Sequence, residues 1–227
     1  MVCGLASEAA SIRKAFRAVE GLEPPLILVS GADPGRAETA ARRLVDEGSD
    51  GLMSVGLCGG LCPDLQVGEL VFATSVVEAG TGERHAIKSW FQPDPFNGLL
   101  PQWRVGPVLG CDHAITSPAD KAAAFKNTGA LAVDMESHAV ARVAAREGLP
   151  MMVVRAVVDD AATTVPDFLA HAMGPSGRPR VVRLAGQLAR YPGQLPALIR
   201  LARSSARAHA SLEVGVIRVA KALRMSA

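Results

Sequence analysis

Aromatic side chains are scarce in this sequence, and it has no long apolar run. Only 4% of the 227 residues are Phe, Trp or Tyr, whereas 49% are hydrophobic. The core must therefore be packed mainly by aliphatic side chains. No stretch reaches the roughly 18 apolar residues that a membrane-spanning helix needs. The start, MVCGLASEAASIRKAF, has no basic leader before an apolar block, so we expect no secretory signal.

Cysteine and histidine are too few and too scattered to form an obvious framework. The four cysteines are Cys3, Cys58, Cys62 and Cys111. The pair at 58 and 62 has no second Cys/His pair nearby, as a zinc site would require. We expect buried, reduced thiols in a cytoplasmic protein. Neither a metal nor another bound cofactor is predicted, because His113 and His138 are not spaced as ligands.

Positive charge is concentrated at the C-terminal end. The net charge is only +2, but from Pro175 onward the chain has ten Lys or Arg residues and one acid, Glu213. That segment carries +9, and the 174 residues before it carry −7. Such asymmetry predicts an anionic partner for the C-terminal segment. We therefore predict a domain over residues 1–174 and a basic helical extension over 175–227.

Apolar runs alternate with amphipathic stretches along the first part of the chain. Strands are predicted at 26–31, 51–60, 65–80, 105–116, 129–135 and 150–160, and helices at 37–48, from 117 onward and at 136–148. Ser117 and Pro118 suit a helix start, and Gly148 suits a helix stop. Residues 80–104 are predicted to form a loop. The alternation indicates an α/β fold whose mixed or mainly parallel sheet is covered on both faces.

A long amphipathic helix is predicted from Pro196 to about Arg224. Its apolar residues fall in one sector of a helical wheel: Leu198, Leu201, Ala208, Leu212, Val216, Val219 and Leu223. The opposite sector is basic, with Arg200, Arg203, Arg207, Arg218, Lys221 and Arg224. Two interpretations remain open. The helix packs its apolar face on the core, or it lies on an anionic membrane surface.

Acidic residues gather where ligands collect in α/β sheets, at the carboxyl ends of strands. Those ends hold Glu8, the 31–36 loop, Gly59-Gly60, Asp112-His113, Glu136 and Asp159-Asp160. Structural explanations also exist: Glu136 as a helix N-terminal acid, Asp159 as a helix cap and Glu8 as a surface acid. Arg155 is predicted to pair with a buried acid. The loop at Arg36 fits no nucleotide motif but resembles an anion site at a helix N-terminus.

Three segments in this order carry a family resemblance: SVGLCGGLCPDLQVGELVFAT, AVDMESHAVARVA and VVRAVVDDA. From about Gly4 to Phe168 the chain resembles the purine nucleoside phosphorylase and methylthioadenosine/S-adenosylhomocysteine nucleosidase superfamily. It looks most like the hopanoid-associated nucleoside phosphorylases, short proteins with a basic, proline-punctuated C-terminal region. The resemblance implies a single α/β domain around a central twisted mixed sheet, and a homo-oligomer.

The resemblance also implies a role for each matching residue. Glu136 matches the glutamate that grips the ribose hydroxyls, with Met135 beneath the sugar, and Asp159 matches the aspartate that protonates purine N7. Glu8 falls where the nucleosidases hold the acid that activates water. The pocket glycines match Gly59 and Gly60. A general acid at N7 is worth about 10²–10⁴-fold in rate, and an ionised carboxylate offsets the positive charge that develops on the ribose.

Three positions depart from the family pattern. Val158 replaces a serine that often precedes the catalytic aspartate, and Leu57 replaces a hydroxyl residue before the glycines. Ala114, followed by Ile115, stands where nucleosidases have an aromatic residue that stacks on the base. We take Ile115 as a substrate contact in its place. These changes indicate a substrate other than ordinary methylthioadenosine.

Three functions are compatible with these residues. The first is removal of adenine from adenosylhopane in hopanoid biosynthesis, by phosphate with Arg36 as a contact or by water. The second is hydrolysis of methylthioadenosine or S-adenosylhomocysteine with Glu8 as general base. The third is nucleoside or lipid binding without turnover. In the first, the cationic helix would bring the enzyme to the inner face of an anionic membrane. A nucleic-acid partner is not predicted.

Overall fold

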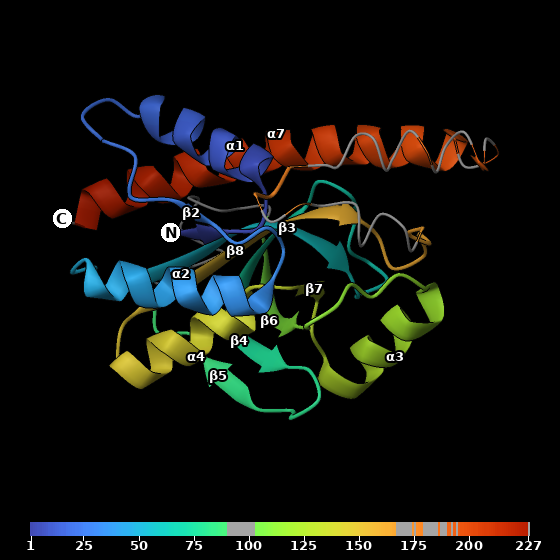
Figure 1. Cartoon of the computed structure of the whole chain (residues 1–227), viewed down its shortest axis with the longest axis horizontal. Coiled ribbons are helices and arrows are strands. Elements are labelled where there is room, and N and C mark those ends of the chain that lie inside the picture. The colour runs from blue at the N-terminus through green and yellow to red at the C-terminus, as the bar shows by residue number, and fades with distance from the viewer. Residues whose placement is uncertain are drawn as a thin grey trace.

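The computed structural model describes residues 1–89, 103–166 and 195–226, together with residues 174, 176–178, 186, 190, 191 and 193. In this part of the chain a mixed β-sheet lies between helices (Figure 1). One face of the sheet is covered by α1 (Ala6–Arg17) and α7 (Leu195–Ser226), and the other by α2 (Pro34–Asp46) and α4 (Ser137–Glu147). The remaining described helix, α3 (Pro118–Thr128), lies at one end of the sheet. The predicted α/β fold is confirmed.

The eight described strands pair in both directions. They are β1 (Val2–Cys3), β2 (Leu28–Val29), β3 (Leu52–Gly60), β4 (Leu70–Glu78), β5 (Arg84–Ala86), β6 (Trp103–Gly110), β7 (Ala132–Asp134) and β8 (Met151–Asp159). Their order is β2-β1-β3-β7-β6-β4-β5, and β8 pairs with both β3 and β4. The pairings β3-β8-β4-β6-β7-β3 therefore close a ring. β3 pairs with β1 near its start and with β7 at its end, and it runs parallel to β8. Its last residues therefore lie beside the end of β8.

Two aliphatic cores fill the space between the sheet and the helices, as the scarcity of aromatic residues predicts. One core joins Ile12 of α1 to Val55 of β3 and Leu212 of α7. The other joins Leu44 of α2 to Val153 of β8 and several alanines of α4. Small residues at those helix positions let the helices lie close to the strands.

The C-terminal helix packs its apolar face on the core, as one of the two interpretations requires. Ala208, Leu212, Val216 and Val219 are buried against the first core. The N-terminal half of α7 continues along the same side of the molecule past the ends of β3 and β8 (Figure 1). No helix among the described residues is both long and apolar enough to cross a membrane.

Local sequence signals place most helix ends correctly. The Ser117 hydroxyl accepts a hydrogen bond from the Asp120 backbone N–H (3.1 Å), and Gly148 ends α4 with a left-handed φ of 66°. The loop predicted over residues 80–104 is wrong in part, because β5 forms a hairpin with β4 there and β6 begins at Trp103. Residues 90–102 of that loop lie outside the described part of the chain.

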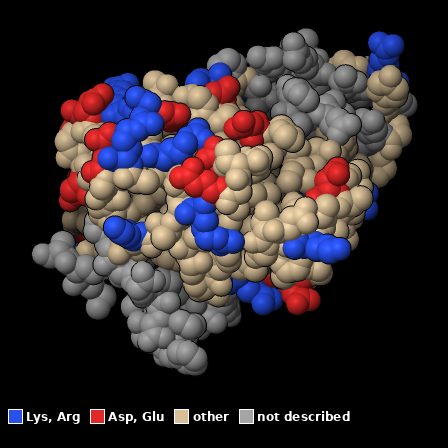
Figure 2. Space-filling model, turned by 90° about the horizontal axis from the view of Figure 1, so that it is seen from below, with Lys and Arg blue, Asp and Glu red and all other residues tan. Residues whose placement is uncertain are grey.

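Basic and acidic side chains are intermixed on the face seen from below in Figure 2. Arg42 pairs with Glu38 on α2, and Arg142 of α4 pairs with both Glu38 and Glu78. Such pairs contribute little to stability where both side chains are exposed.

Candidate active site

A cavity of about 570 Å³ opens at the carboxyl ends of β3, β7 and β8. Polar groups from five parts of the chain line it: Glu8, His113, Thr116, Asp134, Glu136, Asp159 and Ser205. Most of the remaining lining is aliphatic, including Leu5, Leu57, Ile115, Met135, Val158, Val165, Leu198 and Leu201. The three acids singled out in the sequence, Glu8, Glu136 and Asp159, thus lie in one cavity although they are distant along the chain.

Glu8 is a buried acid of α1, so its interpretation as a surface acid is wrong. Its side chain is only 3% exposed. One carboxylate oxygen accepts a hydrogen bond from the Leu5 N–H (2.8 Å), and the other accepts one from the Leu57 N–H (2.7 Å). Burial raises the pKa of Glu8 although these two amides oppose the shift. The carboxylate is therefore fixed in place between α1 and β3.

Glu136 follows β7 at the first turn of α4. Its side chain makes no capping hydrogen bond to the helix, because Asp134 accepts from the backbone N–H groups of Glu136 (2.8 Å) and Ser137 (2.7 Å) instead. The Glu136 carboxyl is left to face the cavity. A Cβ atom at Gly4 would lie 2.5 Å from Glu136 Oε1 and 3.5 Å from Glu8 Oε2, so Gly4 leaves room for both carboxyls.

Arg155 lies behind these acids and is fully buried. Its Nε donates to Asp134 (2.9 Å), and its Nη2 donates to the Ser54 hydroxyl (2.6 Å) and lies 3.7 Å from Glu136 Oε2. The predicted pairing of Arg155 with a buried acid is confirmed. Burial favours a neutral Asp134, but the Arg155 ion pair and the hydrogen bonds hold the pKa of Asp134 below its ordinary value.

One arginine cannot neutralise three buried acids. Burial raises the pKa of Glu136 to about 8, and the nearby charges of Asp134 and Glu8 add to that shift while Arg155 opposes it. A proton is therefore retained in the Glu8–Glu136 pair near neutral pH. Such displaced ionisation at a cavity is typical of functional sites.

We expect Arg155→Met to lower the free energy of unfolding by about 3–5 kcal/mol, because it leaves Asp134 charged, buried and unpaired. Arg43→Met is the matched control. Arg43 is 63% exposed and pairs with Glu47 on the surface of α2, and we expect its loss to cost no more than about 1 kcal/mol. Urea unfolding of both variants would measure the difference. Equal losses would show that the buried pair contributes no more than a surface pair.

Asp159 ends β8 beside Gly59 of β3. A Cβ at Gly59 would lie 3.2 Å from Asp159 Oδ2, so the glycine provides the space for this carboxyl. Asp159 does not cap a helix among the described residues, because residues 160–166 contain one turn and otherwise no regular structure. Burial raises its pKa, and Lys121 opposes that shift. A buried carboxyl that faces a cavity is suited to proton donation.

Lys121 is a site residue that the sequence did not reveal. It lies in the first turn of α3 and is fully buried, and its Nζ donates to Asp159 Oδ2. A lysine in an amphipathic helix ordinarily points to solvent. Only the approach of α3 to the end of β8 places it here.

The structure separates the other predicted substrate contacts into two groups. Met135, Gly59 and Ile115 line the cavity. Gly60 and Arg36 are not among its described lining residues. The Arg36 guanidinium donates to the carbonyl oxygens of Ser30 (2.5 Å) and Gly31 (3.3 Å), so it fastens its own loop, and we do not assign it to the site.

Helix α7 contributes an apolar wall to the cavity, whereas the sequence predicted its apolar face to pack on the core or to lie on a membrane. Leu198 and Leu201 belong to the predicted apolar sector, but they line the cavity together with Ala202 and Ser205. Only the later part of the sector, from Ala208 onward, packs on the core. The wall exists because α7 extends beyond the sheet.

The four cysteines are free, and three of them are buried as expected. Cys62 differs, because it is partly exposed. Burial raises the pKa of Cys58, which lines the cavity, so its thiol stays protonated. It is therefore a poor nucleophile.

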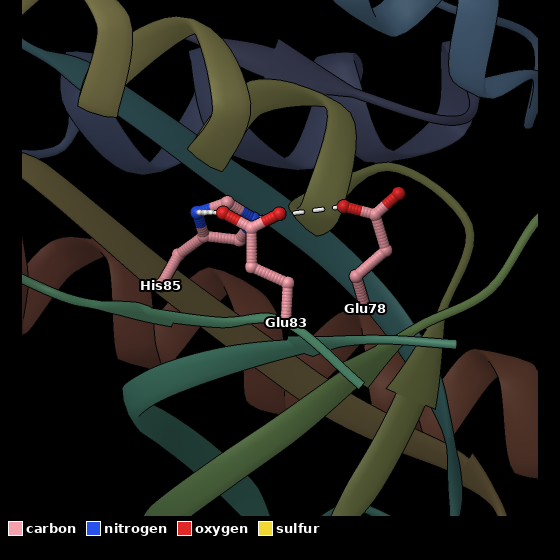
Figure 3. A group of neighbouring side chains, drawn as sticks. All are labelled: Glu78, Glu83 and His85. Carbon is pink, nitrogen blue, oxygen red and sulfur yellow. Dashed lines mark ion pairs between the residues drawn. The ribbon is translucent and has the colours of Figure 1, made fainter. Parts of the chain in front are cut away.

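One group of side chains away from the cavity has ligand atoms close enough to surround a metal ion. Glu78, Glu83 and His85 come from the β4–β5 hairpin and point toward one another (Figure 3). His85 Nε2 lies 3.6 Å from Glu78 Oε2, and its Nδ1 lies 3.8 Å from Glu83 Oε1. Arg142 also donates to Glu78 (2.5 Å). Arg142 therefore already supplies a positive charge to this group, and none of the three residues lines the cavity.

Comparisons with known proteins agree with this fold. The family model described as "Phosphorylase superfamily" matches residues 7–190. A comparison with curated proteins found no match. The structure of 5′-methylthioadenosine/S-adenosylhomocysteine nucleosidase from Helicobacter pylori with butyl-thio-DADMe-Immucillin-A is similar over 94% of this chain and 94% of that chain, with 17% identity and a TM-score of 0.63.

Two further solved structures are similar. The Neisseria meningitidis nucleosidase of the same name, in complex with methylthio-immucillin-A, aligns over 95% of this chain and 96% of that chain, with 18% identity and a TM-score of 0.63. Futalosine hydrolase of Helicobacter pylori aligns over 71% and 84%, with 19% identity and a TM-score of 0.55. At these identities the likeness concerns the fold, whereas the family model covers most of the sequence. The chain belongs to the phosphorylase superfamily.

Proposed function

We propose that this protein cleaves the N-glycosidic bond of a 5′-substituted adenosine and releases adenine, with adenosylhopane as its substrate. The observation that carries the proposal is the convergence of Glu8, Glu136 and Asp159 on one cavity. Glu136 binds the ribose hydroxyls above Met135, and Asp159 protonates N7 of the departing base. The solved relatives named for methylthioadenosine/S-adenosylhomocysteine nucleosidase and futalosine hydrolase support a nucleoside-like substrate.

Water is the nucleophile that the cavity favours. Its described lining contains two buried glutamates and no Lys or Arg. A phosphate dianion would be repelled there, and Leu57 offers it no hydroxyl. Glu8, fixed by two backbone amides, is placed to accept a proton from water as that water attacks C1′.

The apolar wall favours a lipid-like 5′ substituent. Leu198 and Leu201 would contact such a group, and Ala114 offers the base no ring at the position where the nucleosidases have one. This is the reason to prefer adenosylhopane over the second candidate, methylthioadenosine or S-adenosylhomocysteine, whose nucleosidases share the fold. A protein that binds nucleoside without turnover remains the third candidate.

The proposal includes contact with an anionic membrane through the basic face of α7. Arg200, Arg203 and Lys221 are exposed, while the opposite apolar face lines the cavity at Leu198 and Leu201 and packs on the core from Ala208 onward. The contact would therefore be electrostatic and would weaken with salt. The cytoplasmic location, the homo-oligomeric state and the domain boundary near residue 174 stay predictions.

Adenine release by the purified full-length chain tests the function. We expect release from adenosylhopane, with and without phosphate, and faster release from anionic than from neutral vesicles. Leu201→Ser should lower kcat/KM for adenosylhopane by about tenfold, because burial of one leucine is worth about 1.5–3 kcal/mol. The effect on methylthioadenosine should be smaller. Ile199→Ser, at a residue that is 44% exposed on the same helix, is the control.

Each other outcome of that assay has a definite meaning. Adenine release that requires phosphate would establish phosphorolysis. Equal losses on both substrates in Leu201→Ser would remove the argument for a lipid substituent. If no 5′-substituted adenosine released adenine, binding without turnover would be the candidate that remains.

A further inference from the structure

We propose that Lys121 is a positioning residue for Asp159, which holds the carboxyl at the leaving base and stabilises the carboxylate that remains after its proton has moved. This inference rests on the proposed function, in which Asp159 is the general acid. It assigns a part in the reaction to a helix, α3, that contains none of the acids of the cavity.

The Lys121 ammonium is fixed independently of Asp159. Its Nζ donates to the carbonyl oxygens of Asp160 (2.8 Å) and Thr163 (3.0 Å) as well as to Asp159 Oδ2. All three of its N–H donors are therefore used. Two of the acceptors are backbone groups that do not titrate, so the cation keeps its place whether Asp159 is protonated or ionised.

The two oxygens of Asp159 have different surroundings. Oδ2 faces Lys121, whereas Oδ1 has no hydrogen-bond partner among the described residues. Asp159 lines the cavity, so Oδ1 is available to a ligand. The other titratable groups close to this carboxyl are Asp160, which follows β8, and the Cys58 thiol of β3. Lys121 is thus the one cation among the described groups that face Asp159.

This arrangement meets two opposite requirements of a general acid. Before reaction, burial favours the protonated form of Asp159. During reaction the C1′–N9 bond breaks with its electron pair moving to the purine, the Asp159 O–H bond breaks, and the proton moves to N7. The carboxylate left behind would be costly to bury alone, and the ammonium stabilises it. A proton from solvent then restores the acid.

A purely structural role is the competing explanation, because Lys121 also fastens the turn after β8 to α3. The two roles differ in their dependence on the leaving group. Adenine needs a proton to depart, whereas 4-nitrophenolate departs without one. If Lys121 only holds the turn in place, its loss should slow both reactions alike. If Lys121 assists the general acid, its loss should slow mainly the release of adenine.

The experiment compares Lys121→Met and Lys121→Gln in the full-length chain with Lys126→Met, an exposed lysine of the same helix. The substrates are adenosylhopane, methylthioadenosine and 4-nitrophenyl 5-methylthioriboside. We expect both Lys121 variants to lose about 10²-fold in kcat for adenine release and only a few-fold for nitrophenolate release. The alkaline limb of their pH profile should move to higher pH, since Asp159 without its cation keeps its proton longer. Lys121→Arg, which keeps a cation, should recover part of the loss.

Thermal unfolding of each variant identifies losses that come from misfolding, and Lys121→Gln retains donors for the backbone carbonyls if Lys121→Met does not fold. Equal losses for both leaving groups, with an unmoved alkaline limb and no recovery in Lys121→Arg, would overturn the inference. That result would leave the proposed function intact. Absence of adenine release by the wild-type chain would instead overturn the proposed function itself.

Discussion

Asp159→Asn is expected to lower kcat for adenine release by about 10²–10⁴-fold, the usual contribution of a general acid. Asparagine fills the same space beside Gly59 and can donate a hydrogen bond to N7, but it cannot transfer a proton. Because burial raises the pKa of Asp159, wild-type kcat should decline as the pH rises and the carboxyl loses its proton. The variant should lack that decline. Steady-state kinetics across pH would measure both effects.

Asp160→Asn is the control for this variant. The Asp160 carboxylate accepts a hydrogen bond from the Thr163 hydroxyl (2.7 Å), and the residue is absent from the described lining of the cavity. We expect its activity to stay within a few-fold of wild type. If Asp159→Asn kept wild-type activity, or if Asp160→Asn lost as much, Asp159 would not be the acid.

Glu136→Gln is expected to bind a 5′-substituted adenosine but to lower kcat by about 10²–10³-fold. The amide still forms hydrogen bonds with the ribose, but it has no charge to offset the positive charge that develops on the sugar. Ligand-induced thermal stabilisation and adenine release, measured on one preparation, would separate binding from turnover. Glu147→Gln, at an exposed residue at the other end of α4, is the control. Loss of binding together with turnover would assign Glu136 to affinity alone.

The raised pKa of Glu136 adds a pH test. The ionised form accepts both ribose hydroxyls, so kcat/KM of the wild type should rise as the pH increases through about 8, and Glu136→Gln should not show that rise. The folded chain holds this proton more tightly than the unfolded chain, where the pKa is near 4.5. The contribution of Glu136 to stability is therefore complete below that value and is lost as the pH rises through 8.

Much of the fold could be read from local patterns. The α/β alternation, the cap at Ser117, the stop at Gly148 and the span of α7 all depend on neighbours within a few residues. The β4–β5 hairpin was missed because β5 has three residues, RHA, without an apolar alternation. A strand that short is recognised only by the partner with which it pairs.

The candidate acids were found for a different reason. Glu136 follows β7 and Asp159 ends β8, and ligands collect at such strand ends in α/β sheets. Because β8 runs parallel to β3 and β7 runs antiparallel to it, the sequence did not show that these two ends meet. Glu8 was found among the same strand ends, and the family resemblance gave it its role. For Arg36 the sequence pattern was not sufficient, because a basic residue in a glycine-containing loop can equally hold its own loop in place.

The amino-acid sequence by itself determined most of the strands and helices, which acids lie at the strand ends, and which face of α7 is apolar, because these properties depend on residue type and on spacing along the chain. Only the tertiary structure decided what meets in the cavity. It placed Lys121 against Asp159, set Arg155 behind the two glutamates and directed Leu198 into the cavity instead of the core. Those contacts join residues that lie far apart along the chain, so residue type and spacing could not show them.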